Sequence, residues 1–588
     1  MFPTVTMTNA AAIATGHYPG DSGQFGNNLF VGRRMFATGN FGRMPGSLTP
    51  NVEDDQVLAD IDDLFRGNYV REPSLLSSAR THGYNTAAIG KIGPTALQDV
   101  SQLAPANGRF AVPATIILDG VTGTPAGVPL ARDVARLLAD AHLGTGPPRR
   151  VQATGTNVTA GALSPNTEHY RWLADAATKV VLPMFVRSGK PLVLVFWSGD
   201  PDQTQHAQGD SLNSLTPGVN GPTSRAAVRN ADNLLKQLRD YVSAEPALRD
   251  NTDMFVTSDH GFSTVSRHDI DARGHFTASY SATFVYKDAM GRQEVNTGYL
   301  PPGAMAIDVA HALDLPLYAP DLEVTDREGV HVFASIDPRI PQQTATARQH
   351  PAGGALIGGT GRVTSRDAKV IVAGSSFYVP DHDGQTVRRM VAFLATQDYV
   401  GALFVHDSYG TIPGALPMSA IGHVGVSTLP APALIVAPRE FALDPANPIM
   451  TSVLVDGAVL QQGQGNHGAM ARANTFNNMA AIGPDFKQRF VDDAPVGNVD
   501  IAPTLAKVMG ISVLGIGTLR GRVLAEALAG GPPRVSSRAR VVRSGLAGSG
   551  KATVLSYQQV GSQRYVDAAC FDQNDCGAQT AARPPRVD

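Results

Sequence analysis

The chain has 588 residues, of which 43% are hydrophobic and 17% charged, and its formal net charge is −3. A chain of this length and composition buries a large core and divides into more than one compact unit. Its near-neutral charge, spread along the sequence, argues against a nucleic-acid scaffold. No apolar run reaches the roughly 18 residues of a transmembrane helix, and no secretory signal is visible at the N-terminus.

Helical spacing alternates with short apolar runs through the first half of the chain. This pattern predicts helices at residues 73–84, 179–189 and 223–244 and strands at residues 85–91, 190–198 and 252–261. The continuous apolar run at 190–198 is typical of a strand that is covered on both faces. Alternation of this kind predicts an α/β fold with a mostly parallel sheet flanked by helices.

A second group of elements follows, which we interpret as an inserted α/β cap. Strands are predicted at residues 370–380, 402–407 and 431–441, and a helix at residues 383–397. A further helix, at residues 503–510, is predicted to end the core. The predicted divisions are the first part of the core at 1–330, the cap or lid at 331–440, the rest of the core at 441–528, and a linker with a C-terminal extension at 529–588.

The two cysteines, Cys570 and Cys576, lie close together in CFDQNDC near the end of the chain. No neighbouring residues complete a metal site, which favours a local disulfide. A disulfide would indicate an oxidising compartment. The alternative is a pair of unrelated thiols.

Acidic and histidine side chains gather in three loops. The first, GDPDQTQHAQGD at residues 199–210, follows a predicted strand and offers Asp202 and His206. The second follows another strand and offers Asp259 and His260, and the third, GQGNHGAM, offers His467. Ligands gather beyond the carboxyl ends of parallel strands. The three motifs together therefore indicate a single site more strongly than any one of them alone.

These residue types indicate metal chemistry. Carboxylate oxygens together with imidazole nitrogens suit zinc, and also manganese or iron. Two such ions about 4 Å apart clamp the attacking and leaving oxygens of a displacement at phosphorus. Asp259 and His260 are neighbours, so both point inward only where the strand has ended and the backbone turns. The structural alternative for each motif is a side chain that caps a turn.

Four separated stretches resemble the alkaline phosphatase superfamily and, within it, the type I phosphodiesterase/nucleotide pyrophosphatase branch. They are FPTVTMTNAAAIATGHYPGDSG near the N-terminus, DPDQTQH, TSDHG and GNHGAM. The resemblance spans residues 2–510 and implies an alkaline-phosphatase-like α/β fold. It also implies a divalent-metal-dependent hydrolase that acts on phosphodiester or pyrophosphate bonds of a small phosphoester substrate.

The resemblance implies roles for particular residues. Thr6 matches the nucleophile, and Asn27 matches a residue that donates a hydrogen bond to a phosphoryl oxygen. The resemblance implies two divalent ions, expected to be Zn²⁺, with Mn²⁺ or Fe as alternatives. The implied ligands of one ion are Asp202, His206 and His467. Those of the other ion are Asp259 and His260 with the Thr6 oxygen. Met7, Thr8 and Ser22 depart from the family pattern, which bears on loop shape and specificity more than on chemistry.

One ligand of the family pattern has no counterpart. In that pattern a strand ending in Asp-Gly precedes the nucleophile, and its Asp holds the second ion. Met1 lies only five residues before Thr6, so we expect an N-terminally truncated chain. A signal peptide for the periplasm or for secretion would have been lost with that segment. Asp119 in TIILDGV is a weak substitute because it follows the nucleophile, and its simpler interpretation is a turn residue at a strand end.

Other functions remain open. A sulfatase needs a modified Cys or Ser that Thr6 cannot supply, whereas a phosphomonoesterase of the same superfamily fits the motifs. The alternative of a different class is a non-catalytic domain that has lost one metal site with its first strand. Lys91, at a strand end, either approaches an anion or lies on the surface, and His17 in TGHYP faces either substrate or solvent.

Overall fold

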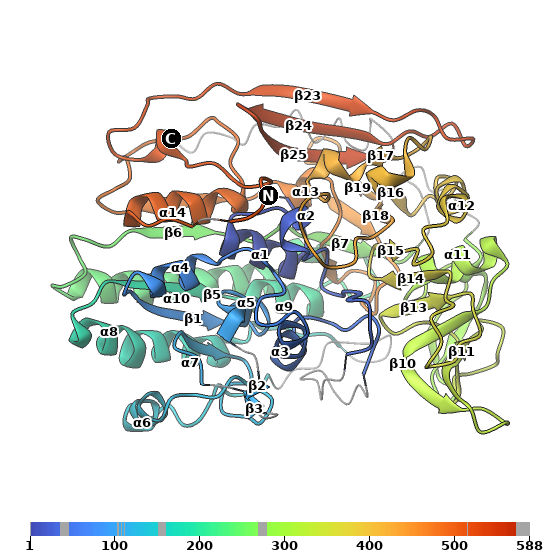
Figure 1. Cartoon of the computed structure of the whole chain (residues 1–588), viewed down its shortest axis with the longest axis horizontal. Coiled ribbons are helices and arrows are strands. Elements are labelled where there is room, and N and C mark those ends of the chain that lie inside the picture. The colour runs from blue at the N-terminus through green and yellow to red at the C-terminus, as the bar shows by residue number, and fades with distance from the viewer. Residues whose placement is uncertain are drawn as a thin grey trace.

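The computed structural model of the chain describes residues 2–35, 46–102, 105–106, 109–110, 112–150, 160–268, 279–513 and 515–571. Figure 1 shows how its parts are arranged: a small sheet with long helices at the left, a large sheet at the right, and three C-terminal strands along the top. The N-terminal helix lies where these parts meet.

Three parallel strands form the sheet predicted from the first half of the chain. They lie in the order β4-β1-β5, with β1 at Asn85–Gly90, β4 at Ile116–Asp119 and β5 at Leu192–Trp197. Gly90 pairs with both Asp119 and Trp197, so the three strands end at one edge. An added Cβ at Gly90 would lie 2.0 Å from the Trp197 carbonyl oxygen, so this strand end requires glycine.

Helices pack around this sheet and confirm the predicted alternation. They are α4 Leu75–Thr81, α6 Arg132–Asp140, α7 Thr167–Ala176, α8 Leu182–Ser188 and α10 Pro222–Ala244. The side chain of Ser74 caps α4 by accepting a hydrogen bond from the Ser77 amide at 3.0 Å. Ile89 and Leu118 of the sheet share one buried core with Leu173 and Leu234 of the helices.

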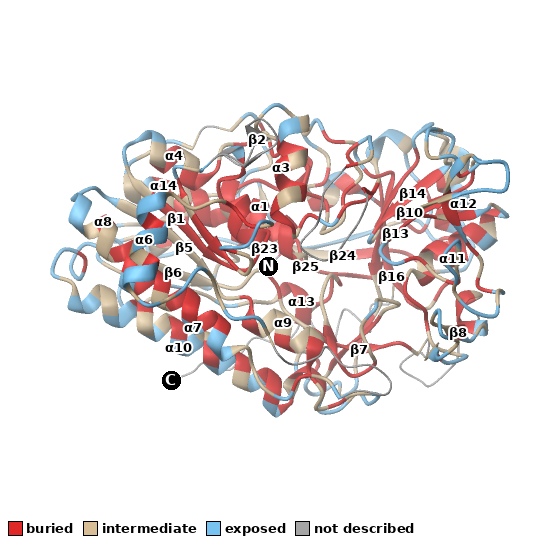
Figure 2. Ribbon diagram, turned by 90° about the horizontal axis from the view of Figure 1, so that it is seen from below, coloured by how far each residue is buried: buried red, intermediate tan, exposed pale blue. Residues whose placement is uncertain are grey.

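The N-terminal segment forms a buried helix rather than a loop. Helix α1 spans Thr6–Thr15, and all of its residues except Ile13 are buried. Its run of alanines favours the helix, and Gly16, with φ of +74°, ends it. Figure 2 shows α1 enclosed between the parallel sheet and the large sheet. Short helices near it are α2 Pro19–Ser22, α3 Asp55–Leu64 and α5 Pro94–Leu97.

A nine-stranded sheet, mostly antiparallel, dominates the second part of the chain. Its order is β12-β11-β10-β13-β14-β15-β18-β16-β17. The bounds are β10 Leu317–Thr325, β11 His331–Ile336, β12 Ala347–Arg348, β13 Gly354–Ile357, β14 Val370–Ala373, β15 Ser376–Tyr378, β16 Val400–Val405, β17 Leu416–Pro417 and β18 Leu434–Pro438. Helices α11 Ala304–Leu313 and α12 Gly384–Leu394 share its hydrophobic core. The domain boundaries at 330, 440 and 528 stay predictions.

Residues 370–380, predicted as one strand, form a hairpin. β14 and β15 pair antiparallel, with Ile371 opposite Tyr378. Gly374 supplies the turn with φ of +57°, a conformation that suits glycine. The apolar pattern concealed the turn because both strands are fully buried and only Gly374 and Ser375 separate them.

The two strands that precede ligand motifs differ in part from the prediction. β5 and β6, the latter at Met254–Thr257, both form, but β6 pairs antiparallel with β22 at Met479–Ile482 and not with β5. The residues of β5 and β6 are half-buried rather than covered on both faces. Among the described residues, the parallel sheet therefore consists of β4, β1 and β5, and β6 forms a separate two-stranded sheet with β22.

A four-stranded sheet carries the glycine-rich motif. Its order is β19-β20-β7-β21, with β7 at Ser263–Ser266, β19 at Glu440–Ala442, β20 at Ser452–Val455 and β21 at Gly465–Asn466. β21 pairs with β7, which begins three residues after His260. This pairing brings the GNHG and DHG motifs together across about 200 residues of sequence.

The C-terminal region adds helix α13 Arg472–Thr475, helix α14 Ile501–Met509 and a sheet in the order β23-β24-β25. The strands span Arg538–Arg543, Val554–Val560 and Gln563–Cys570. Cys570 is disulfide-bonded, and Cys576 lies outside the described residues. The remaining short strands are β2 Pro105–Ala106, β3 Arg109–Phe110, β8 Tyr286–Lys287 and β9 Gln293–Val295.

Among the helices of the described residues, none has the length and apolar character needed to cross a membrane.

Asp62 of α3 gives the fold a pH dependence that can be measured. Burial raises the pKa of Asp62 to about 7, above the value of about 4 in an unfolded chain. The folded state therefore binds the proton more tightly and loses stability as pH rises from about 4 through about 7. Asp62→Asn keeps an oxygen for the Tyr69 amide, which lies 3.3 Å from Asp62 Oδ1.

We expect Asp62→Asn to raise the free energy of unfolding by about 1–2 kcal/mol at pH 8 and to change it little at pH 4. Urea unfolding at both pH values measures this, with the exposed Asp140→Asn as a control of equal charge change. A variant less stable than the wild-type chain at pH 8 would contradict the assignment.

Candidate active site

Thr6 is the first residue of α1, and its hydroxyl faces a histidine. Thr6 Oγ1 lies 3.1 Å from His260 Nε2, and the side chain is fully buried. The amide of the next residue, Met7, donates to Asn27 Oδ1 at 3.0 Å. The N-terminus of a helix attracts anions through its free amides and its dipole. Thr6 and Asn27, predicted as site residues, therefore lie on either side of one helix start.

Asp202 and His206 lie on a helix and not on the loop that the sequence analysis predicts. Helix α9 spans Asp200–Ala207, starts directly after β5, and has Pro201 in its first turn with acidic side chains around it. These are signals of a helix N-terminus that the sequence offered. The spacing of four places both side chains on one face, with His206 Nε2 3.2 Å from Asp202 Oδ1.

His467 lies against both of the other ligand motifs. Its Nε2 is 3.6 Å from Asp202 Oδ1, and its ring stacks on that of His260 with centroids 3.6 Å apart. Its Nδ1 lies 3.0 Å from the Thr4 carbonyl oxygen, just before the start of α1. His206 Nδ1 is held in a similar way, 2.8 Å from the Gly465 carbonyl oxygen. Such contacts fix imidazole rings so that the other nitrogen is presented to a ligand.

Asp259 and His260 follow the end of β6 and point into the same space. His260 Nε2 lies 3.2 Å from Asp259 Oδ2. The turn that carries them is held by Asn498, whose Nδ2 donates to the Ser258 and Asp259 carbonyl oxygens, each at 3.1 Å. The same amide donates to Asn9 Oδ1 of α1 at 2.9 Å. This asparagine, which sequence reasoning did not find, links the turn to the helix that carries Thr6.

The arrangement fits a divalent metal ion. One ligand atom each from Asp202, His260 and His467 lie within 4.8 Å of one another. Asp202 Oδ1 is buried and accepts no hydrogen bond among the described residues, although two imidazole nitrogens face it. The donor set of carboxylate oxygen and imidazole nitrogen is that of zinc, manganese or iron sites. The division into two ligand sets stays a prediction, since this group draws from both.

The electrostatics of the group favour a charged carboxylate beside uncharged imidazole. Burial opposes ionisation of Asp202, but Lys91 and His206 outweigh it and hold the pKa of Asp202 well below its usual range. Burial and the neighbouring His260 hold the pKa of His467 well below its usual range. Both groups are therefore in the protonation states that bind a cation.

Lys91 lies at the centre of the site, as one of its two sequence interpretations allowed. It directly follows β1 and is 5% exposed, and its Nζ lies 2.8 Å from Asp202 Oδ2 and 3.0 Å from Glu53 Oε1. Burial opposes its charge, but Asp202 and Glu53 raise the pKa of Lys91 above its usual range. Glu53 Oε1 also accepts from Asn27 Nδ2 at 3.3 Å. Glu53 was missed by sequence reasoning because no motif marks it.

Asp119 is a turn residue at the end of β4. Its Oδ1 accepts from the Val121 amide at 3.0 Å, and its backbone amide donates to Thr122 Oγ1 at 2.7 Å. Burial and the adjacent Asp119 carboxyl raise the pKa of Asp55 well above its usual range, so this carboxyl pair holds a proton. Among the described residues, Asp119 does not belong to the group around Asp202.

His17 faces neither substrate nor solvent, in contrast to both sequence interpretations. It is buried between two carboxylates, with Nδ1 3.0 Å from Asp21 Oδ2 and Nε2 3.7 Å from Glu72 Oε2. Glu72 accepts from the Ile516 and Gly517 amides, and Asp21 accepts from the Leu519 amide at 2.7 Å. The acids are thus satisfied by backbone donors, and the cluster joins the N-terminal segment to the 515–519 loop.

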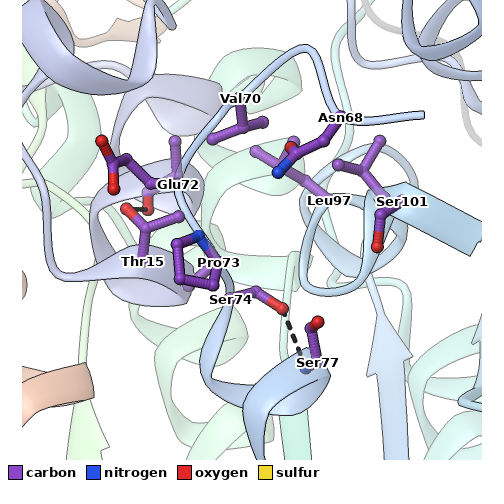
Figure 3. A pocket seen from close by; sticks show the side chains of 12 residues that line it. Thr15, Asn68, Val70, Glu72, Pro73, Ser74, Ser77, Leu97 and Ser101 are labelled. Carbon is purple, nitrogen blue, oxygen red and sulfur yellow. Dashed lines mark hydrogen bonds between the residues drawn. The ribbon is translucent and has the colours of Figure 1, made fainter. Parts of the chain in front are cut away.

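A cavity of about 20 Å³ lies beside α1. Figure 3 shows Thr15 and Glu72 at one side of it, Leu97 and Ser101 at the other, and the hydrogen bond that the Ser77 amide donates to Ser74 Oγ. It has room for one water molecule, whereas sites for small molecules measure about 300–1,000 Å³. A phosphoester therefore does not bind there, and the group of side chains around Thr6 and Lys91 remains the candidate site.

Several solved structures are similar to this one. The structure is similar to human ectonucleotide pyrophosphatase/phosphodiesterase 5, at 12% identity and a TM-score of 0.39, over 87% of this chain and 86% of that one. It is also similar to the alkaline phosphatase PafA, at 12% identity and a TM-score of 0.44, over 90% of each chain.

A murine ectonucleotide pyrophosphatase/phosphodiesterase 5, inactive and in complex with AMP, is 13% identical with a TM-score of 0.40, over 90% of this chain and 89% of that one. No curated protein sequence matches the chain. The family described as type I phosphodiesterase/nucleotide pyrophosphatase matches residues 1–310, which is more than half of the chain. The chain therefore belongs to the type I phosphodiesterase/nucleotide pyrophosphatase family, a group of phosphoric ester hydrolases.

Proposed function

We propose that the chain hydrolyses phosphodiester or pyrophosphate bonds of a small phosphoester, with Thr6 as nucleophile and two divalent ions, of which Zn²⁺ fits the donors best. The observation that carries the proposal is the position of Thr6 Oγ1, at a helix N-terminus and 3.1 Å from His260 of the ligand group. A threonine hydroxyl is a weak nucleophile near neutral pH, so it must be activated by its surroundings.

The proposed ligands are Asp202, His206 and His467 for one ion, and Asp259 and His260 with Thr6 for the other. When bound, such ions lower the pKa of a hydroxyl or water and neutralise charge that develops on the phosphoryl group. The protein's own part is to hold these ligands in place through Asn498, Gly465 and Thr4, and to keep the hydroxyl out of bulk water.

The reaction has two halves. Thr6 Oγ1 passes its proton to water and bonds to phosphorus as the bond to the leaving oxygen breaks. The leaving group departs with the bonding electron pair and takes up a proton from water, which leaves a phosphoryl ester on threonine. Water then attacks the same phosphorus, the bond to Thr6 breaks, and the hydroxyl regains a proton. Asn27 Oδ1 accepts a hydrogen bond from the Met7 amide, which supports the proposal that its Nδ2 donates to a phosphoryl oxygen during both halves.

The disulfide at Cys570 supports a periplasmic or secreted location for the protein, since such bonds persist in oxidising compartments. This location is part of the proposal.

The first test is hydrolysis of bis-p-nitrophenyl phosphate by chain that has been stripped with a chelator and reloaded with Zn²⁺ or Mn²⁺. We expect release of nitrophenol only after reloading. Equal rates in the stripped and reloaded chain would contradict the metal dependence. No hydrolysis of this diester or of p-nitrophenyl phosphate under any metal would favour the non-catalytic alternative, while hydrolysis of the monoester alone would favour a phosphomonoesterase.

A further inference from the structure

A carboxylate lies beside the donors that would face a phosphoryl group. Glu53 Oε1 is 3.3 Å from Asn27 Nδ2 and 3.0 Å from Lys91 Nζ. The Glu53 side chain is 14% exposed, so it is not sealed in the core. Any anion that accepts a hydrogen bond from Asn27 therefore comes close to a second negative group.

The charge of Lys91 does not cancel this effect. Its ammonium binds Glu53 on one side and Asp202 on the other, which sets one positive charge against two negative charges. In a site with limited solvent, an excess negative charge a few ångströms from a ligand raises the free energy of a second negative charge there. Relative to an uncharged residue at this position, Glu53 therefore raises the free energy of a doubly charged phosphoryl group beside Asn27 more than that of a singly charged one, whether or not metal ions are bound.

The position of Glu53 is fixed by the backbone around it. Its amide donates to Asn51 Oδ1 at 2.8 Å. Gly93, with φ of +82°, packs so closely that an added Cβ would lie 2.6 Å from the Glu53 Cα. This contact holds the Glu53 backbone against the turn that carries Lys91. The Glu53 backbone is therefore held in place, and its carboxylate is positioned by the hydrogen bonds from Lys91 and Asn27.

We propose that Glu53 is a specificity-determining residue, which makes the site favour phosphodiester monoanions over phosphomonoester dianions. This inference rests on the proposed function and names the substrate class of the same site. A phosphomonoester carries close to two charges at pH 8, because its second ionisation has a pKa of about 6. The additional ester group of a diester removes that second charge, so the diester is not repelled by Glu53.

The test compares two substrates with one leaving group, methyl p-nitrophenyl phosphate and p-nitrophenyl phosphate, at pH 8 with Zn²⁺. The variant Glu53→Gln keeps an oxygen for Lys91 and Asn27 and removes the charge. We expect kcat/KM for the monoester, divided by that for the diester, to rise about tenfold in Glu53→Gln. Glu53→Asp, which keeps the charge, is expected to keep the wild-type preference.

The matched control is Asp63→Asn. It removes one charge from an exposed residue of α3, the helix that begins two residues after Glu53. We expect this control to leave the ratio unchanged. A Glu53→Gln variant in which both substrates lose activity equally would assign Glu53 a purely structural role and overturn the proposal. A ratio that changes equally in Asp63→Asn would also overturn it, since the effect would then be one of overall charge.

A binding measurement separates this inference from the proposed function. Calorimetry with Zn²⁺-loaded Thr6→Ala, with and without Glu53→Gln, uses phenyl phosphate and methyl phenyl phosphate as ligands. We expect Glu53→Gln to tighten binding of the dianion about tenfold relative to the monoanion. If the wild-type chain hydrolyses the diester but Glu53→Gln changes neither the kcat/KM ratio nor the relative binding of the two ligands, only the proposed role of Glu53 fails. If it neither hydrolyses nor binds either compound, the proposed function fails as well.

Discussion

Thr6→Ala is expected to lower the rate of diester hydrolysis at least about a thousandfold while leaving the fold intact. The substitution removes the only atom of this side chain that can bond to phosphorus. Alanine suits the first turn of α1, which is already rich in alanine, so the helix is expected to persist. The rate with bis-p-nitrophenyl phosphate and the far-UV circular dichroism spectrum of the variant measure both parts.

Thr6→Ser is the matched control, because serine keeps the hydroxyl and removes only a methyl group. We expect the Thr6→Ser variant to retain measurable hydrolysis. In a separate experiment, wild-type protein that is mixed with radioactive substrate and quenched with acid is expected to carry an acid-stable phosphoryl label. Full activity of Thr6→Ala with an unchanged spectrum would eliminate threonine as the nucleophile and assign attack to water.

The second large effect is expected on metal content. His206→Ala and His467→Ala each remove a proposed ligand, and each should reduce the bound divalent metal after gel filtration and lower activity about a hundredfold or more. The effect of His467 is expected to be the greater, since its ring also stacks on His260. Elemental analysis by mass spectrometry gives the number of ions per chain.

His382→Ala provides the control, since His382 is an exposed histidine in the turn before α12. It should keep the wild-type metal content. Unchanged stoichiometry in both His206→Ala and His467→Ala would remove these residues from the ligand list, whatever happens to the rate.

The sequence predicted the elements better than it predicted their pairing. The spacing in residues 223–244 and the apolar run at 190–198 led to α10 and β5, because each depends on a local pattern. The pairing of β6 with β22 was not predicted, since it is made by contacts across more than 200 residues. The hairpin at Gly374 was missed because both of its strands are apolar.

The prediction of the site residues had the same limit, because only local motifs could be recognised in the sequence. Motifs led to Asp202, His260 and His467, which the structure brings within 4.8 Å of one another. Their roles in catalysis stay predictions. Glu53 could not be found, because its significance lies in distances to Asn27 and Lys91 rather than in any local signature. A residue that acts through charge at close range needs coordinates to be recognised.

The hydrogen bonds between the N-terminal segment and the 515–519 loop also affect when the chain can fold during synthesis. The Tyr18 amide donates to the Leu519 carbonyl oxygen at 2.8 Å, and the Gly20 amide donates to Gly422 at 2.9 Å. A ribosome that adds about 5–20 residues per second needs roughly half a minute to a minute and a half between these partners. During that interval the alanine-rich α1 lacks its final packing partners, so the nascent chain is expected to fold late and to depend on protection from aggregation.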